Sequence, residues 1–302
     1  MKRKVVKQGP ATFMVSLPSK WVKQQGIEKG DEVEVVANGN ELKMHVGPSP
    51  VEKLKEITIT LSHENRVSVR SILGGFYKKG YDLITVNFDN QKIFNIIKES
   101  VNHLIGFDIT HRKPGSCVIK SYLVETPEEF QNTLNKISHT IKTVQEMTRE
   151  DYIKGHYERL EELIDYRFSV WKLRDLSLRI INKRKDFKDN AGAYSIVIWT
   201  LEKINRNYKR IYKYLDMNHI KMNKEVLVYY DDVTKLVDYM LKSIYRKDVE
   251  RIEYMHKEHN RLTQKAFNLL EKQKKDAPVV SYLFENVKRV QDILSSLVAV
   301  NN

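Results

Sequence analysis

The chain has 302 residues, of which 52 are Lys or Arg and 39 are Asp or Glu, so its net charge is +13. This length allows two or three domains, and a hydrophobic content of 41% is enough for packed cores. No apolar stretch approaches the ~20 residues of a membrane-spanning helix, and no apolar segment of a secretory signal follows the basic N-terminus. The single cysteine excludes an internal disulfide framework and fits a reducing cytoplasm. We therefore expect a cytoplasmic protein, and the lack of a long apolar stretch predicts no membrane insertion.

The first 46 residues predict a small β-rich unit around one short helix. Asn38-Gly39 is a strong hairpin signal, because a type I′ turn needs two residues at positive φ. Pro18 is suited to open the helix, and Gly26 is suited to end it in the left-handed conformation. A unit of this size cannot bury its own apolar faces and has no cysteine to staple it, so we expect a homodimer or a higher homo-oligomer.

Positive charge is concentrated at the start of this unit. Residues 1–27 contain no acidic residue, and the first acid is Glu28. Such a charge run is compatible with a solvated surface, and it is also the pattern that recognises a phosphate backbone. The candidate DNA-binding residues are Arg3, Lys4, Lys7, Lys20 and Lys23.

Residues 3–46 resemble the AbrB/SpoVT/MazE family of swapped-hairpin DNA-binding domains. The shared pattern is a basic first strand, then Val15-Ser-Leu-Pro-x-x-Trp21-Val and Gly26-Ile-x-x-Gly30-Asp31-x-Val33. The resemblance implies a dimer whose interleaved hairpins present basic side chains to double-stranded DNA. The family includes antitoxins that use this domain to dimerise and to bind their operator.

The stretch that follows changes character. Gly47-Pro-Ser-Pro50 predicts a linker, and the order β-α-β-α-β-β beyond it predicts a small α/β layer with both helices on one face. Cys117 lies in an apolar strand segment and fits a small buried side chain better than a reactive thiol. Gly74-Gly75, unusual inside a helix, is attributed to close packing against the sheet. This stretch has no phosphate-binding loop and no group of residues arranged for catalysis, so we expect that the protein is not an enzyme.

From residue 126 onward the sequence predicts long helices. Thr126-Pro127-Glu128-Glu129 is a full capping box, with Thr at the N-cap, Pro at N1 and Glu at N3. Apolar residues then recur every three or four positions. Polar breaks at 186–192, 216–223 and 274–278 help to divide this section into six helices, which form two groups of three.

This helical section resembles the PhoU family, whose fold is two three-helix bundles side by side. The order of the whole chain is that of archaeal phosphate uptake regulators. The resemblance implies carboxylates that can hold metal clusters, but this chain keeps Glu202 with Arg206 at the expected Asp position. It likewise keeps Asp292 with Lys288 at the expected Glu position. Because multinuclear metal sites need several oxygen ligands, we expect no metal and no other cofactor.

Two further patterns on the helices could carry chemistry. Glu253-x-x-His256 has the spacing of di-iron ligands, but only one copy occurs, and nearby His259 fits a hydrogen-bonded core residue better than a ligand. The third helix carries a one-sided row of cations, which fits a solvated face or a surface for an anion or acidic partner. Its members are Lys203, Arg206, Arg210 and Lys213.

The sequence therefore predicts an α+β multidomain protein. Its parts are an AbrB-like swapped-hairpin domain at 1–48, a small βαβαββ domain at 51–125 and a PhoU-like six-helix bundle at 126–302. The predicted function is that of a dimeric DNA-binding transcriptional regulator of phosphate uptake or related metabolism. The alternative is a PhoU-like adaptor that regulates a phosphate transporter or signalling protein by direct contact, with the head serving mainly for dimerisation.

Overall fold

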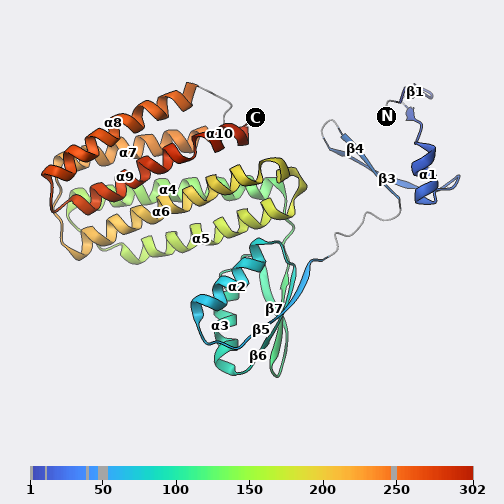
Figure 1. Ribbon diagram of the computed structural model, residues 1–302, viewed down its shortest axis with the longest axis horizontal. Coiled ribbons are helices and arrows are strands. Elements are labelled where there is room, and N and C mark those ends of the chain that lie inside the picture. Colours follow the sequence, from blue (N-terminus) through green and yellow to red (C-terminus); the bar gives the residue numbers. More distant parts are fainter. Residues whose placement is uncertain (1–2, 11, 39–40, 47–53, 246–249, 302) are drawn as a thin grey trace. The chain divides into compact units, whose positions relative to one another are not determined.

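The computed structural model describes residues 3–10, 12–38, 41–46, 54–245 and 250–301 (Figure 1). The chain forms two compact units, Met1–Leu54 and Lys55–Asn302. The predicted mixture of a small N-terminal β unit and a helical C-terminal part is confirmed. Within the described ranges, no helix is long and apolar enough to cross a bilayer.

The first unit, which we call the head, consists of two antiparallel strand pairs and one helix. In β1 and β2, Val5 pairs with Val15 and Lys7 with Phe13. In β3 and β4, Val33 pairs with Val46 and Asn38 with Glu41. The elements in chain order are β1 (Val5–Lys7), β2 (Phe13–Val15), α1 (Ser19–Gln25), β3 (Val33–Asn38) and β4 (Glu41–Val46).

The turn residues of the head agree with the sequence in part. Gly26 ends α1 at φ +66°, in the left-handed conformation that glycine adopts without strain, as predicted. Pro18 is the N-cap with extended backbone, so it precedes the first helical residue, which is Ser19. Asn38 still pairs with Glu41 and therefore belongs to β3, whereas the rest of the predicted turn, Gly39, lies outside the described residues. So does the predicted linker at 47–50.

The second unit begins with a four-stranded sheet in the order β5-β6-β8-β7. β5 and β6 are parallel, and the other neighbours are antiparallel. Figure 1 shows α2 and α3 together on one side of this sheet. Both helices are capped by asparagine, since Asn65 and Asn90 accept hydrogen bonds from the N–H groups of Ser68 and Ile93. The bounds are β5 (Glu56–Leu61), α2 (Arg66–Lys78), β6 (Leu83–Phe88), α3 (Gln91–Val101), β7 (Phe107–Lys113) and β8 (Ser116–Ser121).

Two predictions about this layer have different outcomes. Cys117 is only 1% exposed, in β8 among Ile84, Val86 and Ile119, so its assignment to the core is confirmed. The close packing proposed for Gly74-Gly75 is wrong. A Cβ atom added at either glycine would meet no heavy atom within 4 Å apart from its own helix and chain neighbours. The sheet therefore does not require glycine at these two positions.

The remainder of the second unit is helical. The N-cap of the predicted capping box is confirmed, since the Thr126 hydroxyl accepts the Glu129 N–H at 3.1 Å. The last predicted helix is interrupted at Ile293, whose ψ of 0° leaves the α-helical range. The bounds are α4 (Pro127–Lys154), α5 (Leu160–Lys183), a 3-10 turn (Lys185–Asn190), α6 (Ala191–Met217), α7 (Lys224–Ser243), α8 (Glu250–Lys272), α9 (Ala277–Asp292) and α10 (Leu294–Asn301).

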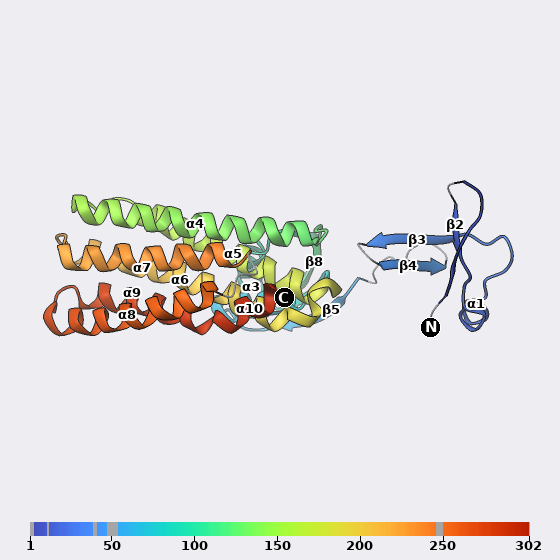
Figure 2. The ribbon, with the colours of Figure 1, turned by 90° about the horizontal axis from the view of Figure 1, so that it is seen from above.

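These helices pack as two groups of three. α4, α5 and α6 contact one another, α7, α8 and α9 do the same, and α6 joins the groups by packing on α9. Figures 1 and 2 show all six running along one common direction. One continuous core links the groups, and it includes Ile137, Leu201, Val233, Leu262 and Val287.

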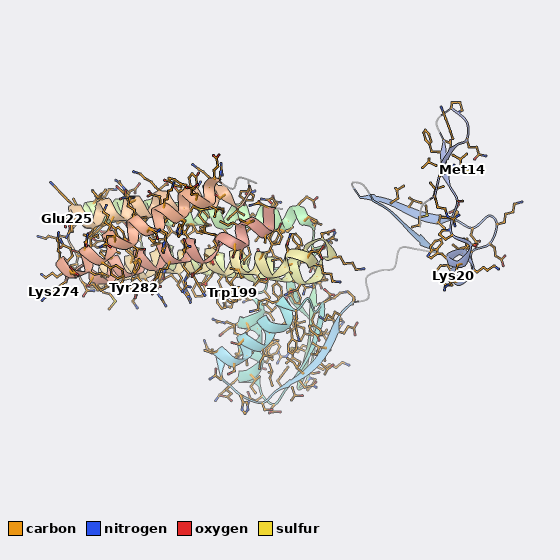
Figure 3. The ribbon with its side chains drawn as sticks, turned by 45° about the horizontal axis from the view of Figure 1, so that its top comes forward. Met14, Lys20, Trp199, Glu225, Lys274 and Tyr282 are labelled. Atoms are coloured by element: carbon orange, nitrogen blue, oxygen red, sulfur yellow. The ribbon has the colours of Figure 1, made fainter. Side chains whose placement is uncertain are left out.

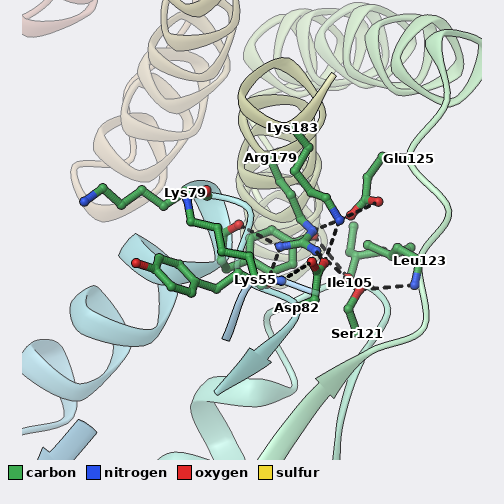
Figure 4. A network of polar contacts seen from close by, with 11 residues as sticks. Lys55, Lys79, Asp82, Ile105, Ser121, Leu123, Glu125, Arg179 and Lys183 are labelled. Carbon is green, nitrogen blue, oxygen red and sulfur yellow. Dashed lines mark hydrogen bonds and ion pairs between the residues drawn. The ribbon is translucent and has the colours of Figure 1, made fainter. Parts of the chain in front are cut away.

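A buried ionic network fastens the sheet layer to the helices (Figure 4). Arg179 of α5 has no exposed surface, and its Nε donates to Glu125 at 2.6 Å. Its other donors reach the Asp82 carboxylate, the Tyr81 carbonyl at 2.6 Å and the Tyr77 carbonyl at 3.1 Å. Lys183 Nζ lies 2.6 Å from Asp82 and 3.3 Å from Glu125. The network holds β6, α2 and the start of α4 against α5.

Candidate nucleic-acid interface

The cations predicted to contact DNA all lie on β1 and α1 of the head or beside them. Arg3 and Lys4 directly precede β1, and Lys7 is its last residue. Because side chains alternate along a strand, Lys7 lies on the same face as Val5 and opposite to Val6. All three cations are exposed. The structure therefore places a short row of free positive charge along the first strand.

The other two cations lie on α1. Lys20 and Lys23 are three residues apart, so they are neighbours on one side of the helix, and both are exposed. Trp21 and Val22, between them in sequence, are half-buried. Lys23 also lies in the last helical turn, where the helix dipole favours a cation. The helix thus directs its lysines outward while its apolar residues pack toward the rest of the head.

The five cations of the head have no ion-pair partners among the described residues. The acids begin in the turn after α1, where the Asp31 carboxylate accepts the Glu28 N–H at 2.7 Å. This local hydrogen bond holds Asp31 within its own turn. The cations therefore remain available for anions outside the chain.

The head also exposes an unusual amount of apolar surface. Val5 is 64% exposed, Phe13 67% and Leu42 67%, and α1 contains no buried residue. Figure 3 labels Met14 and Lys20, whose side chains extend away from the backbone of the head. Isolated exposed apolar residues are ordinary, but here nearly every apolar side chain on β1 and β2 is exposed. Among the head residues whose side chains the structure describes, none is buried.

The second predicted set of cations lies on α6. The structure brings Lys203, Arg206, Arg210 and Lys213 onto one side of this helix, with the first two half-buried and the last two exposed. Lys209 lies close to the same cations. Its pKa is lowered, first by burial and then by the nearby charges of Lys213, Arg167 and Arg210. Sequence reasoning missed Lys209, which lies one position off the stripe. It also missed Arg167, which comes from α5 and is adjacent only in the folded chain.

The two carboxylates that remain from the expected metal signature are far from forming a cluster. Glu202 is 4% exposed, and its carboxylate lies 3.9 Å from the Arg174 guanidinium of α5. Asp292 lies near the surface and pairs with Arg289 at 3.3 Å. In the described ranges, no group of three His, Cys, Asp or Glu side chains is placed to hold a metal ion. Arg174 itself pairs more closely with Asp175, at 2.8 Å, than with Glu202.

The histidines of α8 make amide contacts. His256 lies 3.2 Å from the Gln291 amide oxygen and 3.3 Å from Asn260 Nδ2, and Glu253 pairs with Lys257. His259 is hydrogen-bonded to Asn260, as predicted, but its assignment to the core is wrong. It is half-buried and lines a surface pocket of about 300 Å³ together with α9 residues such as Glu285 and Asp292. The polar side chains of α9 at this level keep the histidine at the edge of the core.

A comparison with known families identifies the head. Residues 6–53 match the family described as antidote-toxin recognition MazE, bacterial antitoxin. Domains of the MazE/AbrB type bind DNA and are dimeric. No curated protein and no solved structure matches the chain. The AbrB/MazE-type character predicted for the N-terminal unit is thereby confirmed, and the match includes Lys7, Lys20 and Lys23.

Proposed function

We propose that this protein is a dimeric transcriptional regulator. In this proposal it binds the phosphate backbone of DNA through Arg3, Lys4, Lys7, Lys20 and Lys23. The observation that carries this proposal is the set of five exposed cations that have no ion-pair partner among the described residues, in a unit whose residues 6–53 match the MazE family. Lysine and arginine that neutralise phosphates release condensed counterions, which drives association with DNA. Base selection then depends on a few further side chains of the head.

The dimer is proposed from the exposed apolar surface of the head. With Val5, Phe13 and Leu42 each at least 64% exposed, a second copy of the head is the economical cover for these side chains. A two-fold dimer presents two identical cationic surfaces, so the preferred DNA site is a pseudo-palindrome or a repeat.

The helical body is proposed to be PhoU-like, as in archaeal phosphate uptake regulators. Support comes from the packing of α4–α6 and α7–α9 as two groups of three helices, which follow a βαβαββ layer along the chain. On this proposal the protein acts in the cytoplasm, has no catalytic activity and regulates phosphate uptake or related metabolism. The body then senses the signal or contacts other proteins, while the head reaches the operator.

The test is the salt dependence of binding to a labelled DNA duplex, measured by fluorescence anisotropy with the full chain. Replacing Arg3, Lys4 and Lys7 by Gln removes up to three phosphate contacts, which reduces the slope of log K against log salt by up to about 2.7. The matched control replaces three exposed cations of the helical body by Gln, so it removes the same net charge. These are Lys136, Lys272 and Lys274.

Two results would contradict the proposal. If the head and control variants changed the slope equally, the cations of β1 would not contact phosphates. If the unaltered chain failed to bind any duplex, the adaptor alternative would replace the regulator, because an adaptor that uses the head only to dimerise needs no DNA affinity. A change confined to the head variant supports the regulator.

A further inference from the structure

α6 is the central helix of the body, and only one narrow stripe of it reaches solvent. Its buried residues include Leu201, Glu202 and Tyr208, and it lies between α5 and α9. The accessible residues recur every three or four positions, which places them on one side of the helix. We call these residues the α6 stripe: Trp199, Lys203, Arg206, Arg210 and Lys213.

The partial burial of two of these cations is energetically unfavourable for a surface whose only role would be contact with water. Charged runs that serve solubility ordinarily lie on outer helices, whereas Lys203 and Arg206 are half-buried on a central one. The Nε atom of Arg206 is buried and has no hydrogen-bond acceptor. A buried donor without a partner is unfavourable, so this arrangement needs a compensating role.

The four cations of the α6 stripe also lack direct ion-pair partners among the described residues. Arg167 of α5 and Lys209 add two further positive charges beside it, and the repulsion contributes to a lowered pKa of Lys209 after the effect of burial. The other cations of the body are frequently paired, as Arg149 is with Asp231 and Lys265 with Asp232. The stripe is therefore a concentrated positive surface whose complement is outside the chain.

An apolar feature lies at one end of this surface. Trp199 is 38% exposed, and Ile196, one turn before it, is 48% exposed. At the other end Arg210 stacks over the ring of Tyr282 from α9, with 5.6 Å between the guanidinium carbon and the ring centre. Figure 3 shows Trp199 and Tyr282 along the same edge of the helical body. The partner should therefore combine carboxylates with an apolar residue near their end.

We propose that the α6 stripe is the docking site for an acidic amphipathic helix of a partner protein. The cations from Lys203 to Lys213 span about 15 Å along α6, at a rise of 1.5 Å per residue. Their steps of three, four and three residues match those of glutamates on one side of an opposing helix. An apolar residue one turn beyond the glutamates would meet Trp199.

The residues beside the α6 stripe favour a single helix over a DNA duplex as the partner. Glu161 of α5 is close enough to Lys209 to act on its pKa, and Glu285 of α9 accepts a hydrogen bond from Asn207 of α6. Acids therefore flank the stripe on both neighbouring helices. The phosphates of a duplex would also face these acids, whereas one helix can lie along α6 between them. A single inorganic phosphate would use only a small part of the row.

The test uses the full chain and a fluorescent helical peptide with glutamates at i, i+3, i+7 and i+10 and a leucine one turn beyond each end. This spacing reads the same in both directions, so the peptide can dock in either orientation. The stripe variant carries Lys203→Gln, Arg210→Gln and Lys213→Gln, and leaves Arg206, whose Nε atom is buried, intact. The control variant is again Lys136→Gln, Lys272→Gln and Lys274→Gln. A second peptide has the same composition with the glutamates scrambled.

We expect the stripe variant to bind the ordered peptide about tenfold or more weakly than the unaltered chain, since three charge pairs are lost, two at exposed cations and one at the half-buried Lys203. The control variant should bind normally, and the scrambled peptide should bind poorly. Because the substituted side chains are accessible and repel one another, the stripe variant should unfold at the same temperature as the unaltered chain or higher. This outcome does not depend on the DNA affinity of the head.

Several results would overturn the proposal. One is the absence of peptide binding, and another is an equal loss in the control variant, which would indicate net charge alone. Equal binding of the scrambled peptide would remove the helical match. If the stripe variant lost affinity for a DNA duplex as strongly as for the peptide, the stripe would be a nucleic-acid surface. Displacement of the peptide by millimolar inorganic phosphate would identify a small-anion site.

Discussion

Replacing Arg179 by Met should separate the energetic contribution of the buried network from ordinary packing. Met keeps an unbranched apolar stem but removes the charge that Asp82 and Glu125 share. Breaking a buried ion pair by removing one partner costs about 3–5 kcal/mol. Lys183 remains within 3.3 Å of both carboxylates, so we expect the lower end of that range. The carbonyls of Tyr77 and Tyr81 also lose a donor.

The assay is thermal and denaturant unfolding of the full chain. A loss of about 3 kcal/mol lowers the unfolding temperature of a domain of 150–250 residues by roughly 6–12 °C. The matched control is Arg184→Met, because Arg184 pairs with Asp186 near the surface, where its side chain is 38% exposed. Such exposed pairs contribute about 0–1 kcal/mol. A loss below 1 kcal/mol for Arg179→Met, or one equal to the control, would refute the reasoning.

Three further predictions concern stability and reactivity. Burial alone would raise the pKa of Asp82, but hydrogen bonds from Lys183 and the Lys55 N–H, together with the Lys183 and Arg179 charges, lower it. Its stabilising contribution is therefore present above the unfolded pKa of about 3.9 and is lost as pH falls through the lower folded value. Asp82→Asn should flatten the acid limb of stability against pH, and an unchanged limb would contradict this assignment. Gly75→Ala should stabilise the chain by up to about 1 kcal/mol, because α2 has room for the methyl group; destabilisation in urea would show otherwise. Burial raises the pKa of Cys117 to about 11, despite the opposing effect of Arg112, so the thiol should react with a disulfide reagent at pH 8 only after unfolding; rapid reaction of the folded chain would be the contrary result.

Local signals in the sequence were good guides to the fold. Gly26 and the Thr126 N-cap act where they were predicted, because turns and caps depend on a few adjacent residues. The succession of strands and helices in the sheet layer, β-α-β-α-β-β, also follows from local periodicity. Gly74-Gly75 was misread because the space around a helix cannot be derived from its own sequence. The role of Arg179 was invisible for the same reason, since Asp82 and Glu125 precede it by 97 and 54 residues.

In the candidate sites, too, some features could be predicted from the local sequence and others only from the folded structure. The cations of the head form a run within a stretch that has no acids, so composition alone could find them. The row on α6 was visible as helical spacing, but its half-buried position became clear only from the packing of α5 and α9 around α6. Arg174, whose guanidinium lies 3.9 Å from the Glu202 carboxylate, lies 28 positions earlier on another helix and gave no local signal.

Genome-wide mapping of the DNA bound in cells tests the central proposal, DNA recognition by the head, most directly. The unaltered chain should enrich discrete sites that share a pseudo-palindrome or a repeat. The variant with Arg3, Lys4 and Lys7 replaced by Gln should lose them, while the stripe variant of α6 should retain them. No enriched sites for the unaltered chain, or the same map for the head variant, would contradict the account.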